Sequence, residues 1–285
     1  MIINPIGDGF AAEVSGIDLT RPLADDLIAA IEAGMDRYAV LVFHDQALTD
    51  DTQREFSRRF GPLEVASGGH VTTAQDRRLP LDMQDASNLD RDQRPFDRDD
   101  RRRMFNLGNR LWHSDSSYRP VTARYSLLSG RVVVSDGGRT EFADMRAAYD
   151  ALDDETKAEV ADLVCEHSLM FSRGALGFTA LSDAEREMFK PVRHPLVRVH
   201  PVTGRKSLFL SAHAGLIAGW PVPEARAFLR DLVEHATQRR FVYSHAWRRN
   251  DLVIWDNRAT MHRVTRFDET QVRDLRRTTI AGIAA

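Results

Sequence analysis

Residues 108–118, Gly-Asn-Arg-Leu-Trp-His-Ser-Asp-Ser-Ser-Tyr, place His113 two positions before Asp115. On a β-strand the side chains of residues i and i+2 point to the same face, so this imidazole and this carboxylate can aim at one point. The spacing predicts a short strand that carries two ligands of a metal site. A His-x-Asp pair is weak evidence alone, because most histidines in proteins are simply polar or packed residues.

A third ligand must come from a distant part of the chain, and His262 is the best candidate. It lies within residues 255–263, Trp-Asp-Asn-Arg-Ala-Thr-Met-His-Arg. Two histidines and one carboxylate on one side of a metal leave the opposite side open, which is the arrangement of non-haem Fe(II) sites. Taken alone, the same donors are also compatible with a zinc hydrolase.

The composition excludes several classes of protein. The chain has 285 residues, a formal net charge of -3 and one cysteine, Cys165. There is no basic excess for nucleic acid, and neither an internal disulfide nor a Cys-rich zinc site can form. The first five residues show no signal peptide, and no uncharged run approaches the roughly 18 residues of a membrane span. We therefore expect a cytoplasmic protein without nucleic-acid or membrane partners, and a homo-oligomer remains open.

Short apolar segments alternate with turns that contain Gly and Pro, and helical periodicity is found mostly early and at the flanks. Helices are expected at residues 24–38, from 49 or 50 to about 61, in two pieces between 144 and 164, and at 223–237. Thr49 or Asp50 can cap the second of these, and Gln53 is available to close a capping box on Asp50. Strands are expected within residues 10–19, which also hold a turn, and at 40–43, 123–134, 139–142, 196–199, 207–210, 241–247, 252–255 and 273–280. Residues 201–204, Pro-Val-Thr-Gly, are expected to form a hairpin turn between two of these strands. This pattern predicts a single domain, residues 1–285, that is mainly β with flanking helices around a jelly-roll (double-stranded β-helix) core.

Residues 66–103 lack periodicity. Their last part, residues 90–103, holds six Arg and five Asp, so it is not a basic patch. Mixed charge without apolar spacing indicates a solvated loop. Long loops in compact domains are often functional, so the segment is also a candidate lid and substrate loop, and the two interpretations are compatible.

Two arginines near the end of the chain suggest an anion site. In an extended strand Arg273 and Arg277 face the same way. Burying two guanidinium groups is costly unless an anion pairs with them, and Arg binds carboxylates through two parallel hydrogen bonds. The alternative is that both lie on a solvated edge, which we would prefer without the His-x-Asp motif.

Taken together, these segments resemble the Fe(II)/2-oxoglutarate-dependent dioxygenases of the taurine dioxygenase family, and within it the aryloxyalkanoate dioxygenases. The likeness is carried by residues 10–19, 56–64 (FSRRFGPLE), 111–118 (LWHSDSSY), 137–152 (GGRTEFADMRAAYDAL), 194–209 and 251–263. It is weakest in residues 66–103, where substrate contacts in this family tend to lie. The resemblance implies a jelly-roll enzyme that uses Fe(II), 2-oxoglutarate and O2, with ascorbate as the reductant in vitro.

The resemblance also implies roles for individual residues. His113, Asp115 and His262 are expected to ligate Fe(II). Thr140 and Arg273 are expected to hold the distal carboxylate of 2-oxoglutarate.

Arg277 matches a second family arginine, placed near the metal and able to meet an anionic group of substrate or co-substrate. Asn109, His70 and His213 are candidates for the substrate pocket. Leu216 stands where the dichlorophenoxyacetate enzyme has a histidine thought to assist with the substrate carboxylate, so the fit around the substrate anion should differ.

The expected substrate is a small organic anion, an aryloxyalkanoate such as 2,4-dichlorophenoxyacetate. Hydroxylation next to the ether oxygen would release a phenol and glyoxylate, while 2-oxoglutarate becomes succinate and CO2. The alternatives are a taurine or alkylsulfonate dioxygenase and a jelly-roll binding protein without catalysis.

Overall fold

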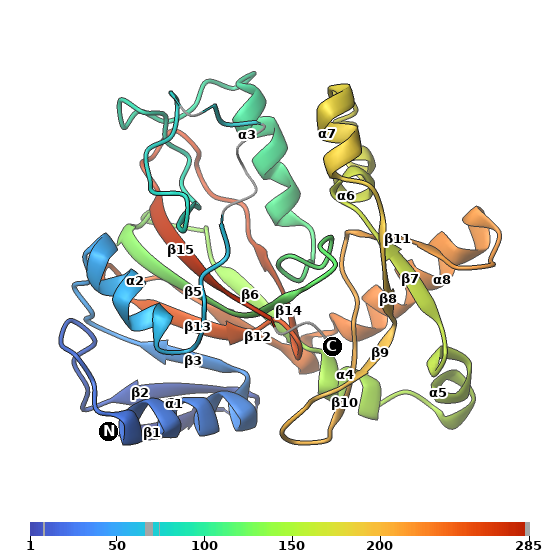
Figure 1. Ribbon diagram of the computed structural model, residues 1–285, viewed down its shortest axis with the longest axis horizontal. Helices are drawn as coiled ribbons and strands as arrows, with labels where there is room; N and C mark the ends of the chain where they lie inside the picture. Colours follow the sequence, from blue (N-terminus) through green and yellow to red (C-terminus); the bar gives the residue numbers. More distant parts are fainter. Residues whose placement is uncertain (8, 66–70, 74, 283–285) are drawn as a thin grey trace.

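The computed structural model describes residues 1–7, 9–65, 71–73 and 75–282. Within these residues the largest sheet has seven strands, and β2 and β3 are its one parallel pair (Figure 1). In spatial order the strands are β1 (Ile2–Ile6), β2 (Ala11–Ser15), β3 (Val40–Phe43), β13 (Leu252–Asp256), β5 (Ala123–Val132), β15 (Asp274–Ala281) and β4 (Gln84–Asp85).

The large sheet is buried on both faces because its central strands are apolar throughout. In β3, Leu41 and Phe43 pack toward helices α1 (Asp25–Tyr38) and α2 (Asp50–Arg58). Val40 and Val42 point to the opposite face, in the same cluster as Phe142 of the second sheet. This period-two alternation between two apolar layers fixes the register, because a slip of one residue would exchange the two faces.

The second sheet has the strand order β12 (Val242–His245), β6 (Thr140–Asp144) and β14 (Thr260–Val264). Phe142 packs inward against the large sheet, whereas its neighbour Ala143 belongs to the cluster under helix α8 (Val222–Ala236). Met261 of β14 also faces that outer cluster, so the next residue, His262, faces the space between the sheets. The alternation on β14 therefore delivers one candidate ligand to the interior.

Smaller elements surround the open end of the two sheets (Figure 1). Helix α3 (Arg101–Asn106) continues into the 3-10 turn η2 (Leu107–Arg110), and α3 contacts α6 (Leu169–Ala175) and α7 (Asp183–Met188) through Phe105 and Arg101. The remaining elements are α4 (Met145–Asp150), α5 (Asp154–Val160), the sheet of β11 (Ala214–Ile217), β7 (Val164–His167) and β8 (Val192–Pro195), the pair β9 (Val197–Val199) and β10 (Lys206–Leu208), and η3 (Arg239–Phe241).

The observed elements confirm the expected mixture of sheets with flanking helices. The helices at 24–38 and 223–237, the broken helix between 144 and 164 and the hairpin around residues 201–204 all form, with ends shifted by a few residues. No helix within the described ranges has the length and apolar character that a bilayer crossing requires.

The start of α2 differs in part from expectation. Thr49 is the N-cap, and it forms a reciprocal capping box with Thr52. The expected alternative, a box between Asp50 and Gln53, was wrong because the Gln53 side chain points into the protein. Its amide donates to the carbonyl oxygens of Leu127 and Arg276, at 3.2 and 3.0 Å.

We predict that Gln53→Ala lowers the free energy of unfolding by about 1–3 kcal/mol, because it leaves two buried carbonyls and the Ser129 hydroxyl without this partner. Urea denaturation measures the change. Gln238→Ala, which truncates an exposed glutamine, is the control and should change the value by less than about 0.5 kcal/mol. Equal effects of the two substitutions would contradict the bridging role of Gln53.

Candidate metal centre and adjoining cavities

A two-residue β-bridge brings His113 and His262 together. The His113 amide donates to the His262 carbonyl at 3.0 Å, and the His262 amide donates to the His113 carbonyl at 2.8 Å. The imidazole centroids lie 4.2 Å apart, and both side chains are buried. Residues 149 positions apart in sequence are thereby fixed as direct neighbours.

Asp115 completes the cluster, but it is not on a strand with His113. Of residues 111–118, only His113 forms a bridge, and the chain turns directly afterwards, with Ser116 at φ 55°. The expected strand was wrong because tertiary hydrogen bonds hold the turn: the Ser114 hydroxyl donates to the Asn257 carbonyl, and the Asp115 amide donates to Oδ1 of Asn257.

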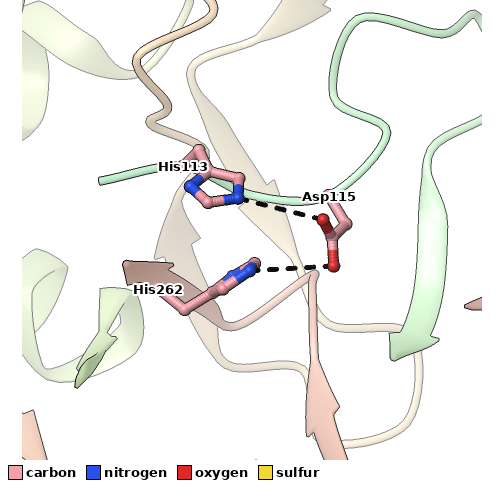
Figure 2. A group of neighbouring side chains, drawn as sticks. All are labelled: His113, Asp115 and His262. Atoms are coloured by element: carbon pink, nitrogen blue, oxygen red, sulfur yellow. Dashed lines mark ion pairs between the residues drawn. The ribbon is translucent and has the colours of Figure 1, made fainter. Parts of the chain in front are cut away.

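All three side chains nevertheless point toward one another (Figure 2). Nε2 of His113 lies 4.0 Å from Oδ1 of Asp115, and Nε2 of His262 lies 3.8 Å from Oδ2. One potential ligand atom from each residue lies within 4.8 Å of the other two.

The protonation states suit metal binding. Burial lowers the pKa of His113, and it lowers the pKa of His262 well below its usual value, so both imidazoles are neutral at pH 7. Burial would raise the pKa of Asp115, but the positive charge of Arg277 outweighs it together with the neighbouring histidines and a hydrogen bond from Ser126, and the pKa falls to about 2. Two neutral imidazoles and one carboxylate form the donor set of a non-haem Fe(II) site, so these residues fit such a metal.

A cavity of about 190 Å³ opens beside His113 and Asp115. One wall comes from the segment between Val71 and Phe96, which belongs to the region singled out as aperiodic. Apolar side chains form much of the lining: Val71, Leu79, Met83, Phe96, Phe105, Leu169 and Phe189. A smaller neighbouring cavity shares Ala86, Ser87, Phe96, Asn106 and Asn109 with it.

Arg273 lies one residue before β15 and lines the smaller cavity. Its guanidinium is buried and donates to the carbonyls of Ala86 and Gly138, both at 3.2 Å. Burial lowers the pKa of Arg273 to about 10, so the group stays charged at pH 7. No Asp or Glu of the described residues forms an ion pair with it, and its guanidinium carbon lies 5.3 Å from the centre of the Phe267 ring.

Thr140 opens β6 and pairs with Val264, which lines the same cavity as Arg273. Its hydroxyl oxygen accepts a hydrogen bond from the Trp247 indole at 2.9 Å. Because the indole nitrogen can only donate, the proton of Thr140 stays available for an acceptor.

Arg277 faces Asp115, and its Nη1 donates to Oδ1 at 2.5 Å. Along β15, Leu275 and Arg277 point inward while Arg276 pairs with Asp50 on the helical side, as the predicted alternation requires. Arg277 lines the larger cavity, and within the described chain its Nε has no hydrogen-bond partner.

The substrate-pocket candidates lie in different places. Asn109 lines both cavities from η2. His213 lines the larger cavity, where its ring lies 5.9 Å from that of His113 and Nδ1 is 2.9 Å from the Ser172 hydroxyl. His70 lies outside the described residues.

Sequence reasoning missed two features of the site. The Ser126 hydroxyl donates to Oδ2 of Asp115 at 2.7 Å and accepts from Asn257, so these residues orient the carboxylate. Asn257 lies within the segment 255–263 quoted above for His262. The sequence therefore showed the residue, but not its contacts with Ser126 and Asp115. Arg173 of α6 is a buried cation on the wall of the larger cavity, and no local pattern marks it.

We predict that His113→Ala, Asp115→Ala and His262→Ala each weaken divalent metal binding by more than the roughly 10- to 100-fold typical of losing a residue that only orients a ligand. Asp115→Glu should retain part of the affinity, because a carboxylate remains with altered reach. Mn(II) titration followed by electron paramagnetic resonance measures the affinity. His235→Gln, a substitution on α8 outside the cluster, is the control. Unchanged affinity in Asp115→Ala would refute the assignment.

Comparison with known proteins places the chain in a family. Residues 3–279 match the model of the family described as taurine catabolism dioxygenase TauD, TfdA. The chain is 47% identical to the alpha-ketoglutarate-dependent 2,4-dichlorophenoxyacetate dioxygenase of Cupriavidus pinatubonensis, over 98% of this chain and 97% of that one.

It is 40% identical to the (S)-phenoxypropionate/alpha-ketoglutarate-dioxygenase of Sphingobium herbicidovorans, over 98% of this chain and 94% of that one. Among solved structures, AAD-2 in complex with Mn(II) and N-oxalylglycine is 60% identical and superposes with a TM-score of 0.97, covering 99% of this chain and 98% of that one. The chain therefore belongs to the TauD/TfdA family of dioxygenases.

Proposed function

We propose that the protein is an Fe(II)- and 2-oxoglutarate-dependent dioxygenase that hydroxylates an aryloxyalkanoate such as 2,4-dichlorophenoxyacetate. The observation that carries the proposal is a buried His113/Asp115/His262 cluster that opens into a partly apolar cavity, next to a buried arginine without an acidic partner among the described residues. The relatives named for dichlorophenoxyacetate and phenoxypropionate support the choice of substrate class.

The positions of the metal-ligating side chains and of the buried arginine suggest where Fe(II) and 2-oxoglutarate would bind. His113, Asp115 and His262 would hold Fe(II), and Arg273 with Thr140 would hold the distal carboxylate of 2-oxoglutarate. When bound, Fe(II) supplies the redox chemistry that couples conversion of 2-oxoglutarate to succinate and CO2 with hydroxylation of the substrate by O2. Arg277 keeps Asp115 ionised, and its remaining donors are available to an anion of the substrate or the co-substrate.

The walls of the larger cavity would bind the substrate. Asn109 and His213 are among its polar lining residues, and His70 is a further candidate by resemblance. We propose that residues 66–103 act as a lid and substrate loop within one dioxygenase domain, residues 1–285, whose two facing sheets form a jelly-roll core. Apolar walls exclude water from the reacting atoms, and the buried cations orient an anionic substrate.

The products follow from the position of hydroxylation. Adding a hydroxyl group to the carbon beside the ether oxygen of an aryloxyacetate gives a hemiacetal, which collapses to a phenol and glyoxylate. The reductant ascorbate serves only in vitro. The one cysteine, Cys165, suits a reducing compartment, so we place the enzyme in the cytoplasm, acting on small organic anions.

A taurine or alkylsulfonate substrate is the alternative. The cavity lining favours an aryl body, because taurine is small and zwitterionic and would leave the walls around Phe96, Phe105 and Phe189 unfilled. A binding protein without catalysis would not require three converging metal donors.

We predict that Arg273→Ala raises the 2-oxoglutarate concentration needed for half-maximal rate by about 30-fold or more, because losing one partner of a desolvated charge pair costs roughly 2–5 kcal/mol. Thr140→Ala removes one neutral donor worth about 0.5–1.5 kcal/mol, so its effect should be smaller. Succinate formation measures both. Arg139→Ala, an exposed neighbour of Thr140, serves as the control. An unchanged requirement in Arg273→Ala would place the dicarboxylate site elsewhere.

We also predict a ranking of substrates. In a panel of aryloxyacetates, 2-aryloxypropionates, aryl carboxylates and taurine, the aryloxyalkanoates should yield the most succinate, and aryloxyacetates should also yield phenol and glyoxylate in equal amounts. Faster turnover of taurine than of any aryloxyalkanoate would overturn the substrate class and leave the iron chemistry intact.

A further inference from the structure

The five arginines that line the larger cavity differ in whether the protein already neutralises them. Arg78 pairs with Asp85 and Asp274. Arg102 pairs with Asp100 at 2.7 Å, and Arg277 pairs with Asp115. Arg77 and Arg173 have no ion pair with any Asp or Glu of the described residues, and of these two only Arg173 is buried.

The contacts of Arg173 fix the position of its guanidinium group and leave its Nε donor without a partner among the described residues. Its guanidinium carbon lies 4.2 Å from the centre of the Phe105 ring, and a Cβ added at Gly108 would lie 2.6 Å from the same carbon. Nη1 donates to the Ser172 hydroxyl at 3.0 Å, while Nε has no partner among the described residues. The group is therefore packed closely in one position, and its Nε donor has no partner among the described residues.

Arg173 is also close to the reacting end of the cavity. The Ser172 hydroxyl that accepts from Arg173 lies 2.9 Å from Nδ1 of His213, and the His213 ring lies 5.9 Å from that of His113. Burial lowers the pKa of His213 well below its usual value, so this histidine is neutral and offers no second positive charge.

An unpaired buried guanidinium is costly, and a carboxylate in the cavity would offset that cost. The apolar residues beside it, Phe105, Leu169 and Phe189, would contact the body of the same molecule. We infer that Arg173 binds the carboxylate of the aryloxyalkanoate substrate and thereby sets the preference of the enzyme for anionic substrates. This inference rests on the proposed function and assigns the substrate anion to α6 rather than to Arg277, which Asp115 already neutralises.

Binding without turnover tests this directly. The protein is loaded with Mn(II) and 2-oxoglutarate under anaerobic conditions, and calorimetry measures the dissociation constants of phenoxyacetate and of its neutral analogue phenoxyacetamide. In Arg173→Gln the constant for phenoxyacetate should rise about 30-fold or more, while that for phenoxyacetamide should change less than about threefold. Arg198→Gln is the control, because Arg198 also lacks an acidic partner among the described residues but lines neither cavity, and it should leave the ratio of the two constants unchanged.

Arg173→Lys keeps the charge without the planar fork and should lower the preference for phenoxyacetate only in part. If Arg173→Gln does not fold, as judged by circular dichroism, this conservative variant decides the question, and an unchanged preference would overturn the inference. Equal weakening of both ligands by Arg173→Gln would overturn it too, because that is the result of a purely structural role.

The experiment also separates this inference from the proposed function. If wild-type protein binds phenoxyacetate but forms no succinate with any aryloxyalkanoate, the proposed function fails while the role of Arg173 in anion binding stands. If wild-type protein does not prefer phenoxyacetate to phenoxyacetamide, the role of Arg173 fails. The proposed function is then tested separately, by measuring succinate formation with aryloxyalkanoates.

Discussion

The paired backbone hydrogen bonds between His113 and His262 are the constraint on which the site depends. They join the turn after η2 to β14, whose register places Met261 in the outer core and His262 in the interior. Asp115 then reaches the same point because Asn257 holds the turn and Ser126 holds the carboxylate. The metal cluster is thus a consequence of sheet register, with little freedom left to the side chains themselves.

Charge balance links this cluster to its ligands. Asp115 is neutralised by Arg277 in the structure, whereas Arg273 and Arg173 are buried with neutral partners. Burial lowers the pKa of each of these two arginines to about 10, which still leaves both charged at pH 7. These two buried, uncompensated cations in adjoining cavities match the two anions of the proposed reaction, 2-oxoglutarate and an aryloxyalkanoate. Under the proposed function, an anionic ligand would offset the cost of each unpaired charge and so be favoured over a neutral one.

The spacing of apolar residues along the chain predicted the helices and strands whose formation depends mainly on neighbouring residues. The strand at residues 40–43 and the helix at 24–38 follow from apolar spacing, and both form. The predicted strand at His113 was wrong because hydrogen bonds to Asn257, distant in sequence, impose a turn. Arg173 was missed for a related reason: sequence shows a charge but not whether an acidic partner will lie beside it. The candidate metal donors His113, Asp115 and His262 do converge, but hydrogen bonds to Asn257, and not strand spacing, bring Asp115 to the two histidines.

The most direct test of the account follows the order in which ligands enter the site. Chelation of Fe(II) by a 2-oxo acid gives a visible charge-transfer absorption band, so the Fe(II)-loaded protein is titrated without O2, first with 2-oxoglutarate and then with phenoxyacetate. We predict that the band appears with 2-oxoglutarate and changes position when phenoxyacetate binds in the adjoining cavity. A protein that shows no band, or a band that phenoxyacetate leaves unchanged at saturation, would contradict a shared site for metal, co-substrate and aryloxyalkanoate.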